Sequence, residues 1–336
     1  MSPPRVSIFG NGNWALTLAD LAYRSGSAVC LYARRDDVAR HLRAKRQHPE
    51  FLPHLRLDGS IHITSSLRTA ANSSRHWVIA VPSQYVRPLA ASLAAFVSGS
   101  HSVLSASKGL ERQSLVRMTE VLQQEWAGRG RPPAISALSG PNLAIDISLG
   151  RPAASVLATQ SADFPLWTGI LGGANLRLYH QTDVAGVELG GALKNILAIA
   201  VGIADQTELG DSAKAALVTR GLHEMGRLAV RLGANWTTLA GLSGLGDVVA
   251  TASSPHSRNH WCGQELGKGR SLAEILAGTS MVVEGVGTTE AAYALGQELA
   301  IPLPITNQVL AIFRGKAVSA AVRDLMTRAL VNESEF

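Results

Sequence analysis

The chain has 336 residues and a formal net charge of +6, with 46% hydrophobic and 17% charged residues. This length predicts about two domains, and the composition excludes a chain that is largely disordered. Because the positive charges are spread along the sequence instead of forming a block, they favour small anionic ligands over nucleic acid as partners.

In the first half of the chain, short runs of β-branched residues alternate with helical patterns. Strands are predicted at 6–9, 29–32, 77–81, 103–107 and 134–138, and two further runs at 153–158 and 176–179 could extend the sheet. Apolar residues three or four apart predict helices at 15–23, 85–96 and 115–126. This alternation predicts βαβ units in a doubly wound, Rossmann-type sheet.

From residue 183 onward, helical patterns follow one another without a convincing strand. Helices are predicted at 186–204, 212–232, 266–277 with a break, 284–299, 305–313 and 317–328. Pro302 and Pro304 separate two of these helices. The predicted fold class is therefore α/β, with a dinucleotide-binding Rossmann-type domain over residues 1–182 and an all-helical substrate-binding domain over residues 183–336.

The two cysteines and the apolar segment 187–204 indicate whether the protein has disulfides, a metal site or a membrane-spanning helix. Cys30 and Cys262 lie far apart without metal-ligand spacing, so neither a disulfide framework nor a metal site is expected. The N-terminal residues lack an export signal, which favours a cytoplasmic protein. Residues 187–204 contain Glu188 and Lys194, and a central lysine is costly in lipid, so a buried helix is predicted instead of membrane insertion.

A glycine-rich motif directly follows the first predicted strand. Gly10 permits a tight turn, Gly12 allows a pyrophosphate to approach the helix N-terminus, and Ala15 lets helix and strand pack closely. Asn13 and Trp14 complete the motif, and Trp14 belongs either to the core or to the cofactor pocket. Its place between strand and helix predicts dinucleotide binding.

The second strand ends in Arg34 and Arg35, where an NAD-selective site usually has a carboxylate. Two arginines suit the 2′-phosphate of NADP, although Asp36 and Asp37 follow at once. The alternative is a solvated charged loop with internal salt bridges. NADP or NAD is the expected cofactor.

Polar residues follow two later strands at the edge where open α/β sheets bind ligands. Lys108 comes just after residues 103–107, and Ser139-Gly140-Pro141-Asn142 ends the strand at 134–138. A surface lysine beside a turn glycine is common, but two polar strand ends that face one crevice strengthen both assignments.

Lys194 is the most informative residue of the second half. Its helical neighbours at three and four residues are apolar or glycine, so it is not a surface salt-bridge lysine. Gly190 and Gly191 leave room on the side toward which its side chain leans. A lysine in an apolar helix has a lowered pKa and can act as a general acid or base, unless it extends to solvent.

A phosphate-type set of ligands follows the glycine-rich stretch that ends at Asp247. Arg258 can hold a phosphate with two hydrogen bonds, and Ser257 and Asn259 add neutral ones. Ser254-Pro255 is predicted to cap a helix whose N–H groups point at the same anion, although a polar loop is the alternative.

Together these residues resemble the bacterial type of NAD(P)-dependent glycerol-3-phosphate dehydrogenase. The matching stretches run in the order of that family: residues 10–15, 107–111, 139–141, 187–195, 210–217, 219–222, 244–247, 257–259 and 282–285. The resemblance implies reversible hydride transfer between NAD(P)H and dihydroxyacetone phosphate, giving sn-glycerol 3-phosphate for phospholipid synthesis.

The resemblance also implies roles for single residues. Lys194 would exchange the proton with the C2 oxygen, and Asn195 and Asp247 would orient Lys194 and the substrate. The other implied substrate contacts are Lys108, Gly140, Asn142, Ser257, Arg258 and Asn259. The implied cofactor contacts are Gly10, Gly12, Asn13, Trp14, Arg34, Lys108, Ala144, Arg258, Val282 and Glu284, and Gly140 also matches a cofactor position.

The chain departs from the family pattern at a few positions. The family usually has Ser or Thr and then Phe where this chain has Asn142 and Leu143, and an arginine where it has Gly287; residues 206–208 replace a glycine-rich run. These changes concern cofactor affinity and loop closure. Because helical second domains of this kind often form dimers, a homodimer is expected. Two other functions compete with this interpretation: a hydroxy-acid or sugar-acid dehydrogenase, and a non-catalytic dinucleotide sensor.

Overall fold

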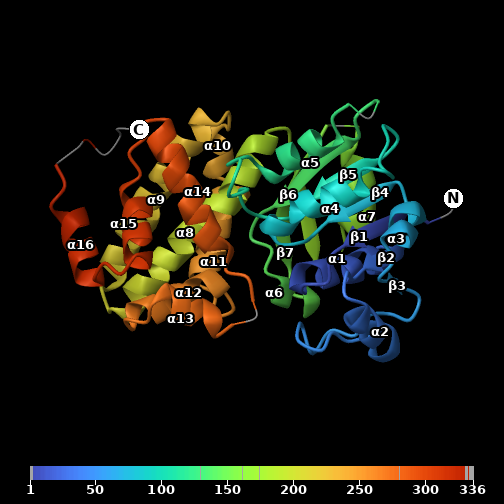
Figure 1. Ribbon diagram of the computed structural model, residues 1–336, viewed down its shortest axis with the longest axis horizontal. Helices are drawn as coiled ribbons and strands as arrows, with labels where there is room; N and C mark the ends of the chain where they lie inside the picture. The colour runs from blue at the N-terminus through green and yellow to red at the C-terminus, as the bar shows by residue number, and fades with distance from the viewer. Residues whose placement is uncertain are drawn as a thin grey trace. The chain divides into compact units, whose positions relative to one another are not determined.

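The computed structural model describes residues 3–128, 130–160, 162–173, 175–279, 281–329 and 332. The chain forms two compact units, and most of their helices and strands are labelled in Figure 1. Unit 1 consists of Met1–Ser107 and Met118–Val184, and unit 2 of Lys108–Arg117 and Ala185–Phe336. Residues 108–117, which were expected in the first domain, therefore pack with the second unit.

Unit 1 is built on a mixed sheet. Its eight described strands are β1 (Arg5–Phe9), β2 (Ala28–Tyr32), β3 (His62–Thr64), β4 (His76–Ile79), β5 (Ser102–Ser105), β6 (Ala134–Ser139), β7 (Ala153–Ala158) and β8 (Leu176–Gln181). They lie in the order β3-β2-β1-β4-β5-β6-β7-β8, and only the β6–β7 pair among them is antiparallel. The predicted α/β class and all seven predicted strands are confirmed. The three-residue β3 is too short to show an alternating pattern and was not predicted.

Strand β1 shows why the sheet carries helices on both faces. Val6 and Ile8 are buried in a cluster shared with the apolar face of helix α1 (Asn13–Arg24). Ser7 and Phe9 point to the opposite face, where the Ser7 hydroxyl donates to the Ala70 carbonyl at 2.7 Å and Phe9 packs on Trp77. Side chains that alternate along a strand thus contribute to two apolar layers.

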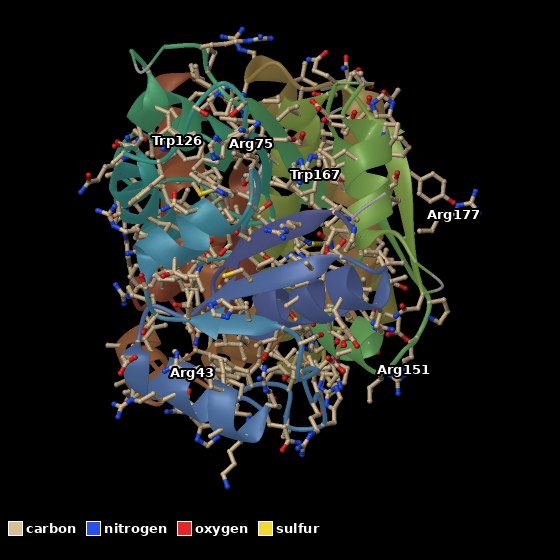
Figure 2. All side chains as sticks on the ribbon, turned by 90° about the vertical axis from the view of Figure 1, so that its right-hand side faces the viewer. Arg43, Arg75, Trp126, Arg151, Trp167 and Arg177 are labelled. Atoms are coloured by element: carbon tan, nitrogen blue, oxygen red, sulfur yellow. The ribbon has the colours of Figure 1, made fainter. Side chains whose placement is uncertain are left out.

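The helices of unit 1 cover this sheet. Besides α1 they are α2 (Asp36–Lys45), α3 (Leu67–Ser73), α4 (Val86–Leu93), α5 (Met118–Trp126), α6 (Ala144–Ser148) and α7 (Phe164–Leu171). Helix α1 packs with α6 and α7, whereas α4 packs with α5. Trp126 of α5 and Trp167 of α7, labelled in Figure 2, are both buried, while Arg177 projects outward from the edge strand β8.

Unit 2 is helical, as predicted. Its helices are α8 (Val184–Gln206), α9 (Asp211–Arg231), α10 (Trp236–Leu239), a π-helical turn (Leu242–Gly246), α11 (Asp247–Ala252), α12 (Arg258–Gly267), α13 (Leu272–Ala277), α14 (Glu284–Glu298), α15 (Pro304–Phe313) and α16 (Val318–Met326). Of the described helices, α8 alone is long and apolar enough to cross a membrane, and its apolar stretch is wholly buried within the protein.

The break predicted within residues 266–277 is present in the structure. Helix α12 ends at Gly267, and α13 begins after Ser271, whose side chain accepts from the Glu274 N–H in a reciprocal capping box. A Ser followed three residues later by Glu is the local signal that marks the start of α13.

Candidate functional site

The glycine motif of unit 1 lies between β1 and α1, where its mechanics require it. Gly10 has φ +133°, and a Cβ there would lie 2.3 Å from the Ala80 carbonyl oxygen. Gly12 is the N-cap of α1, and a Cβ on it would meet no described atom within 4 Å. Any side chain at position 12 would thus fill open space beside the helix N-terminus, the place where a pyrophosphate binds.

Two polar atoms at the same helix start fit a bound polar ligand. The Asn13 Oδ1 and Trp14 Nε1 atoms are buried and have no hydrogen-bond partner among the described residues. Buried polar atoms usually have partners, and leaving one without costs about 1–3 kcal/mol. The residues of this motif therefore fit a dinucleotide.

Arg34 lies between the end of β2 and the start of α2. Its guanidinium carbon stands 5.3 Å from the centre of the Tyr85 ring, and both side chains are exposed. The neighbouring acids have other partners: Asp37 accepts from Arg35 Nε at 3.1 Å, and Asp36 pairs with Arg40 at 2.9 Å. Asp36 and Asp37 thus pair with Arg40 and Arg35, whereas Arg34 contacts the Tyr85 ring.

The second polar strand end, after β6, is tightly packed. Gly140 has φ +126°, and a Cβ there would lie 3.1 Å from the Ser155 Cα. Asn142 is buried and its amide nitrogen donates to the Ser155 hydroxyl at 3.0 Å, so one of its two N–H groups is used within unit 1. Ala144 begins α6, and its carbonyl accepts from the Thr17 hydroxyl at 3.3 Å.

In unit 2, three charged residues that are far apart in sequence meet in a buried cluster. The Lys194 ammonium donates to Asp247 Oδ1 and, at 2.6 Å, to the Thr251 hydroxyl. Lys108 Nζ donates to the other oxygen, Asp247 Oδ2, at 2.6 Å. Asp247 is 1% exposed and Lys194 6% exposed, so these charges interact with little screening by water. We call Lys108, Lys194, Asp247 and Thr251 the lysine cluster.

Burial and charge set the protonation of the lysine cluster. Burial, helped by the nearby Lys108 charge, lowers the pKa of Lys194 to about 8, although Asp247 opposes the shift. Burial pushes the pKa of Asp247 upward, but the two lysines outweigh it and hold that pKa below its usual range. Lys194 can therefore lose and regain a proton near neutral pH while Asp247 stays ionised.

The space beside Gly190 is filled by protein. A Cβ on Gly190 would lie 2.6 Å from the Ser243 carbonyl oxygen, which belongs to the π-helical turn before Asp247. The expected room for a bulky group near Lys194 is thus taken by backbone. Gly190 allows this turn to approach α8 and so places Asp247 against Lys194.

Asn195 and Asn259 form a second buried pair. Asn259 Nδ2 donates to Asn195 Oδ1 at 2.8 Å, and Asn259 Oδ1 accepts from the Gly285 N–H at 2.9 Å. These bonds fix the orientation of the Asn195 amide next to Lys194. They also tie α12 to the start of α14, which begins at Glu284, two residues after Val282.

The helix predicted to begin at Ser254-Pro255 begins later. The N-cap of α12 is Ser257, whose hydroxyl accepts from the His260 N–H at 3.2 Å, whereas Ser254 accepts from the His256 N–H in a turn. The prediction was wrong by three residues because Ser254 and Ser257 both have capping side chains. Arg258 becomes the first helical residue and is exposed at this helix N-terminus.

Sequence reasoning missed Thr251. It stands four residues after Asp247 on α11, so both side chains lie on one helix face, and its hydroxyl also contacts Asp247 Oδ1 at 3.1 Å. The spacing of an acid and a hydroxyl on one face, next to a glycine-rich turn, was the available signal. It became meaningful only once Lys194 was known to face this helix.

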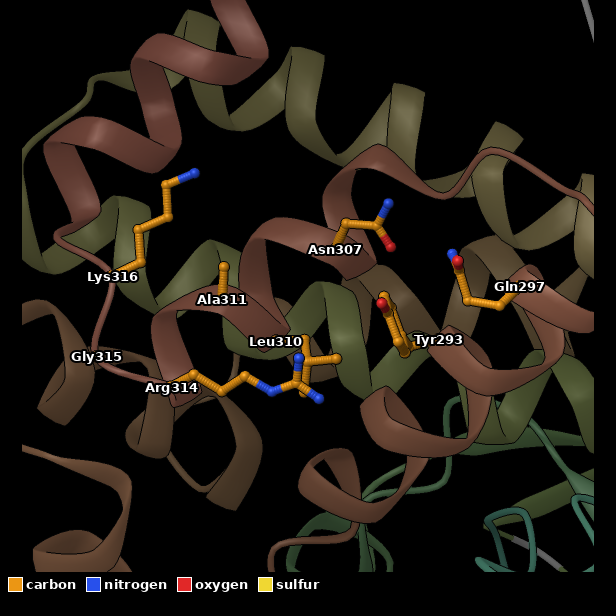
Figure 3. A pocket seen from close by; sticks show the side chains of 8 residues that line it. All are labelled: Tyr293, Gln297, Asn307, Leu310, Ala311, Arg314, Gly315 and Lys316. Atoms are coloured by element: carbon orange, nitrogen blue, oxygen red, sulfur yellow. The ribbon is translucent and has the colours of Figure 1, made fainter.

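A separate pocket of about 630 Å³ lies in unit 2 between α14, α15 and the residues that follow α15 (Figure 3). It is lined by Tyr293, Gln297, Asn307, Leu310, Ala311, Arg314, Gly315 and Lys316. Arg314 stacks on Tyr293, and Lys316 is bound by Gln308 and Asp324. None of these lining residues belongs to the lysine cluster.

The chain is similar to known proteins over nearly its whole length. Models of the NAD-dependent glycerol-3-phosphate dehydrogenase N-terminus and C-terminus match residues 5–164 and 183–323. A glycerol-3-phosphate dehydrogenase [NAD(P)+] of Salinibacter ruber is 41% identical over 98% of this chain and 97% of its own length. One of Solidesulfovibrio magneticus is 40% identical over 98% of this chain and all of its own.

A solved structure agrees with these relatives. The crystal structure of glycerol-3-phosphate dehydrogenase from Coxiella burnetii, 32% identical, matches 98% of this chain and all of its own with a TM-score of 0.92. The glycine motif, the lysine cluster and the two matched family models lead to one assignment. This chain belongs to the NAD-dependent glycerol-3-phosphate dehydrogenase family.

Proposed function

We propose that this chain catalyses the reversible NAD(P)H-dependent reduction of dihydroxyacetone phosphate to sn-glycerol 3-phosphate, with Lys194 as the general acid. The observation that carries the proposal is a buried lysine whose pKa lies at about 8 and whose ammonium is held by Asp247 and Thr251. An amine with that pKa can give a proton to an alkoxide and take one from an alcohol near neutral pH.

Reduction of the ketone requires a hydride at C2 and a proton at the C2 oxygen. The dihydronicotinamide ring of NAD(P)H, when bound, supplies the hydride. Lys194 supplies the proton and becomes a neutral amine, which returns to the ammonium form by taking up a proton. In the direction of oxidation, the neutral amine accepts the hydroxyl proton.

The lysine cluster also stabilises the charge that develops on the C2 oxygen. Two ammonium groups and one carboxylate leave a net positive charge in a buried place. Fixed positive charge of this kind lowers the energy of a developing oxyanion, most strongly where water is excluded. Asp247 holds both lysines in place, so it orients the acid without giving up its own charge.

We assign the phosphate end of the substrate to the start of α12. Arg258 is exposed at the helix N-terminus, where its guanidinium and the helix N–H groups both favour an anion. The Ser257 hydroxyl accepts from His260 and can still donate its own hydrogen to a phosphate oxygen. The remaining proposed substrate contacts are Lys108, Gly140, Asn142, Asn195 and Asn259.

The proposed cofactor residues begin with the glycine motif. Gly12 offers the helix start for the pyrophosphate, the unpaired Trp14 Nε1 can donate and the unpaired Asn13 Oδ1 can accept from a cofactor hydroxyl, and Arg34 offers a cation for a 2′-phosphate. The other proposed contacts are Gly10, Lys108, Ala144, Arg258, Val282 and Glu284. A cytoplasmic location and a homodimer stay predictions.

Replacing Lys194 tests the proposal. We expect Lys194→Met to lower kcat for dihydroxyacetone phosphate by roughly a hundredfold or more, the scale of a general acid contribution, with cofactor affinity retained. The assay follows NADPH absorbance. Lys268→Met, which removes a half-exposed lysine at the end of α12, is the control and should keep the kcat of the original chain. Near-normal turnover in Lys194→Met contradicts the assignment.

A substrate panel separates the competing functions. Oxidation of NADPH by dihydroxyacetone phosphate, but not by unphosphorylated dihydroxyacetone or by keto acids, supports the proposal. Turnover of a keto acid instead points to a hydroxy-acid dehydrogenase, and cofactor binding without turnover points to a sensor. The product, sn-glycerol 3-phosphate, would supply glycerophospholipid synthesis.

A further inference from the structure

The Lys108–Arg117 segment forms a closed loop that belongs to unit 2. Its two arms meet in an antiparallel bridge between Leu110 and Arg117, and the Glu111 N–H donates to the Val116 carbonyl at 3.0 Å. Because the arms are hydrogen-bonded to each other, a displacement of Arg117 carries Leu110 with it. Lys108 stands only two residues before Leu110.

The returning arm of this loop is anchored on α8 by a buried ion pair. Arg117 Nη1 donates to Glu188 Oε2 at 2.8 Å, and the two side chains are 16% and 5% exposed. Leu110 is buried in the core of unit 2, and Leu115 packs against the same core. Glu188 lies on α8 less than two turns before Lys194, so one helix carries both the anchor and the proposed acid.

The other arm carries Lys108 to the lysine cluster. Lys108 occupies one oxygen of Asp247 while Lys194 and Thr251 occupy the other. The charged groups that act on Lys194 are Asp247 of α11, which raises its pKa, and Lys108 of the loop, which lowers it. The position of Lys108 therefore affects how readily Lys194 gives up its proton.

We propose that Arg117 and Glu188 are positioning residues: their buried ion pair holds the loop on α8 and so keeps Lys108 on Asp247, beside Lys194. The inference rests on the proposed function for its kinetic readout. Neither residue belongs to the lysine cluster. They act through Lys108, and their loss moves a positive charge away from the proton donor.

The first experiment compares Glu188→Gln with the original chain in the direction of reduction. We expect kcat to fall by roughly ten- to a hundredfold, because a shift of about 1 Å in a group near the reacting atoms can lower the rate by that factor. The pH midpoint of kcat should move upward, because Lys194 is relieved of the repulsion from Lys108 and holds its proton more tightly. An unchanged midpoint overturns the inference, whatever happens to kcat.

Glu125→Gln is the matched control. Glu125 pairs with Arg87 at 2.7 Å within unit 1, and the side chains of Arg87 and Glu125 are 30% and 24% exposed. Loss of this pair should affect stability while leaving the pH midpoint in place. If Glu188→Gln does not fold, two variants keep the charges: Glu188→Asp shortens the acid, and Arg117→Lys replaces the guanidinium by an ammonium. Each should give a smaller upward shift of the pH midpoint. If the pH midpoint of kcat in both variants equals that of the original chain, the positioning role is contradicted.

A second readout does not depend on turnover. Competitive labelling of lysines with acetic anhydride, followed by mass spectrometry, measures how accessible and reactive Lys108 is relative to Lys268. We expect Lys108 labelling to rise severalfold in Glu188→Gln and to stay at the original level in Glu125→Gln. Unchanged Lys108 labelling overturns the inference. If the original chain does not reduce dihydroxyacetone phosphate, the proposed function fails, but the labelling result still decides whether the pair positions Lys108.

Discussion

Lys194 derives its chemistry from two opposing effects on one ammonium group. Burial favours the neutral amine, and the carboxylate of Asp247 favours the charged form. The helix pattern predicted that no neighbour on α8 could pair with Lys194, and its partners Asp247 and Thr251 indeed come from α11, more than fifty residues along the chain. The protonation of this lysine is thus set by side chains that meet it only in the folded protein.

The pKa of Lys194, at about 8, predicts opposite pH profiles for the two directions of the reaction. Reduction needs the ammonium form, so its kcat should fall as the pH rises through about 8. Oxidation needs the neutral amine, so its kcat should rise over the same range. Initial rates in both directions from pH 6 to 10, at saturating substrate, check the prediction; profiles that rise or fall together contradict it.

The position of Arg34 predicts a preference for NADPH over NADH. Asp36 and Asp37 are bound to other arginines, so the cation at position 34 is available to a 2′-phosphate. We expect NADPH to be used at least as well as NADH. A charge-assisted hydrogen bond contributes about 1.5–3 kcal/mol, or roughly ten- to a hundredfold in affinity. Arg34→Ala should therefore lower kcat/KM for NADPH by about that factor and spare NADH.

The control for this prediction is Arg68→Ala, which removes an exposed arginine that stands over the Phe96 ring and leaves the pairs of Asp36 and Asp37 intact. Both cofactors should be used as before. Equal losses of NADPH and NADH use in Arg34→Ala would show that Arg34 contacts a part common to both cofactors.

The proposed site of unit 2 depends on how closely α8 and α12 cross. A Cβ on Gly202 of α8 would lie 2.1 Å from the His260 carbonyl oxygen, and a Cβ on Gly263 of α12 would lie 2.1 Å from that of Ile199. Both contacts are with backbone, which cannot move aside as a flexible side chain can. Each helix therefore has a glycine where the other helix approaches. The close crossing brings Asn259 of α12 to Asn195 of α8.

We predict that Gly263→Ala destabilises the protein by about 1–3 kcal/mol or more, as expected for overpacking. The added methyl group forces α12 away from α8, so the proposed phosphate contacts move and KM for dihydroxyacetone phosphate should rise. Thermal melts and steady-state kinetics measure the two effects.

Gly169→Ala is the matched control for the helix crossing. Gly169 lies in α7, and a Cβ there would meet no described atom within 4 Å. The substitution should be neutral or stabilising by about 0.5–1 kcal/mol, the ordinary effect of replacing a helical glycine. If both variants behaved alike, the close crossing of α8 and α12 would not be the reason for the loss.

The two units are interleaved along the chain. Residues 108–117 leave unit 1 after β5, pack with unit 2, and return to unit 1 at α5. In unit 2 they give Lys108 to Asp247 and Arg117 to Glu188, two acids that are each less than a tenth exposed. Unit 2 is therefore incomplete as a continuous stretch of sequence.

We predict that a fragment of residues 185–329 does not melt cooperatively, because the buried Glu188 loses Arg117 and Asp247 loses one of its two lysines, Lys108. The same fragment carrying residues 108–117 through a flexible linker should recover a cooperative transition. Circular dichroism melts of the two fragments make the comparison. A cooperative transition in the shorter fragment would show that the loop is not needed for the fold of unit 2.

The alternation of strands and helices, the change to helices near residue 183 and the place of the glycine motif could all be predicted from the sequence. These features arise from residues that are neighbours along the chain, since a strand alternates every second residue and a helix repeats every 3.6. The types of several site residues followed in the same way: a lysine in an apolar helix and an arginine beside capping serines are local patterns.

Other features were decided by tertiary structure. Ser254 and Ser257 both have a side chain that can cap a helix, and in the folded protein Ser257 is the N-cap of α12. The space beside Gly190 is filled by the Ser243 backbone. Residues 108–117 pack with unit 2, which contains the acids that pair with their charged side chains. Local patterns could not foresee these outcomes, because each depends on a close approach or a buried charge between segments that are distant in sequence, and such contacts exist only once the chain has packed.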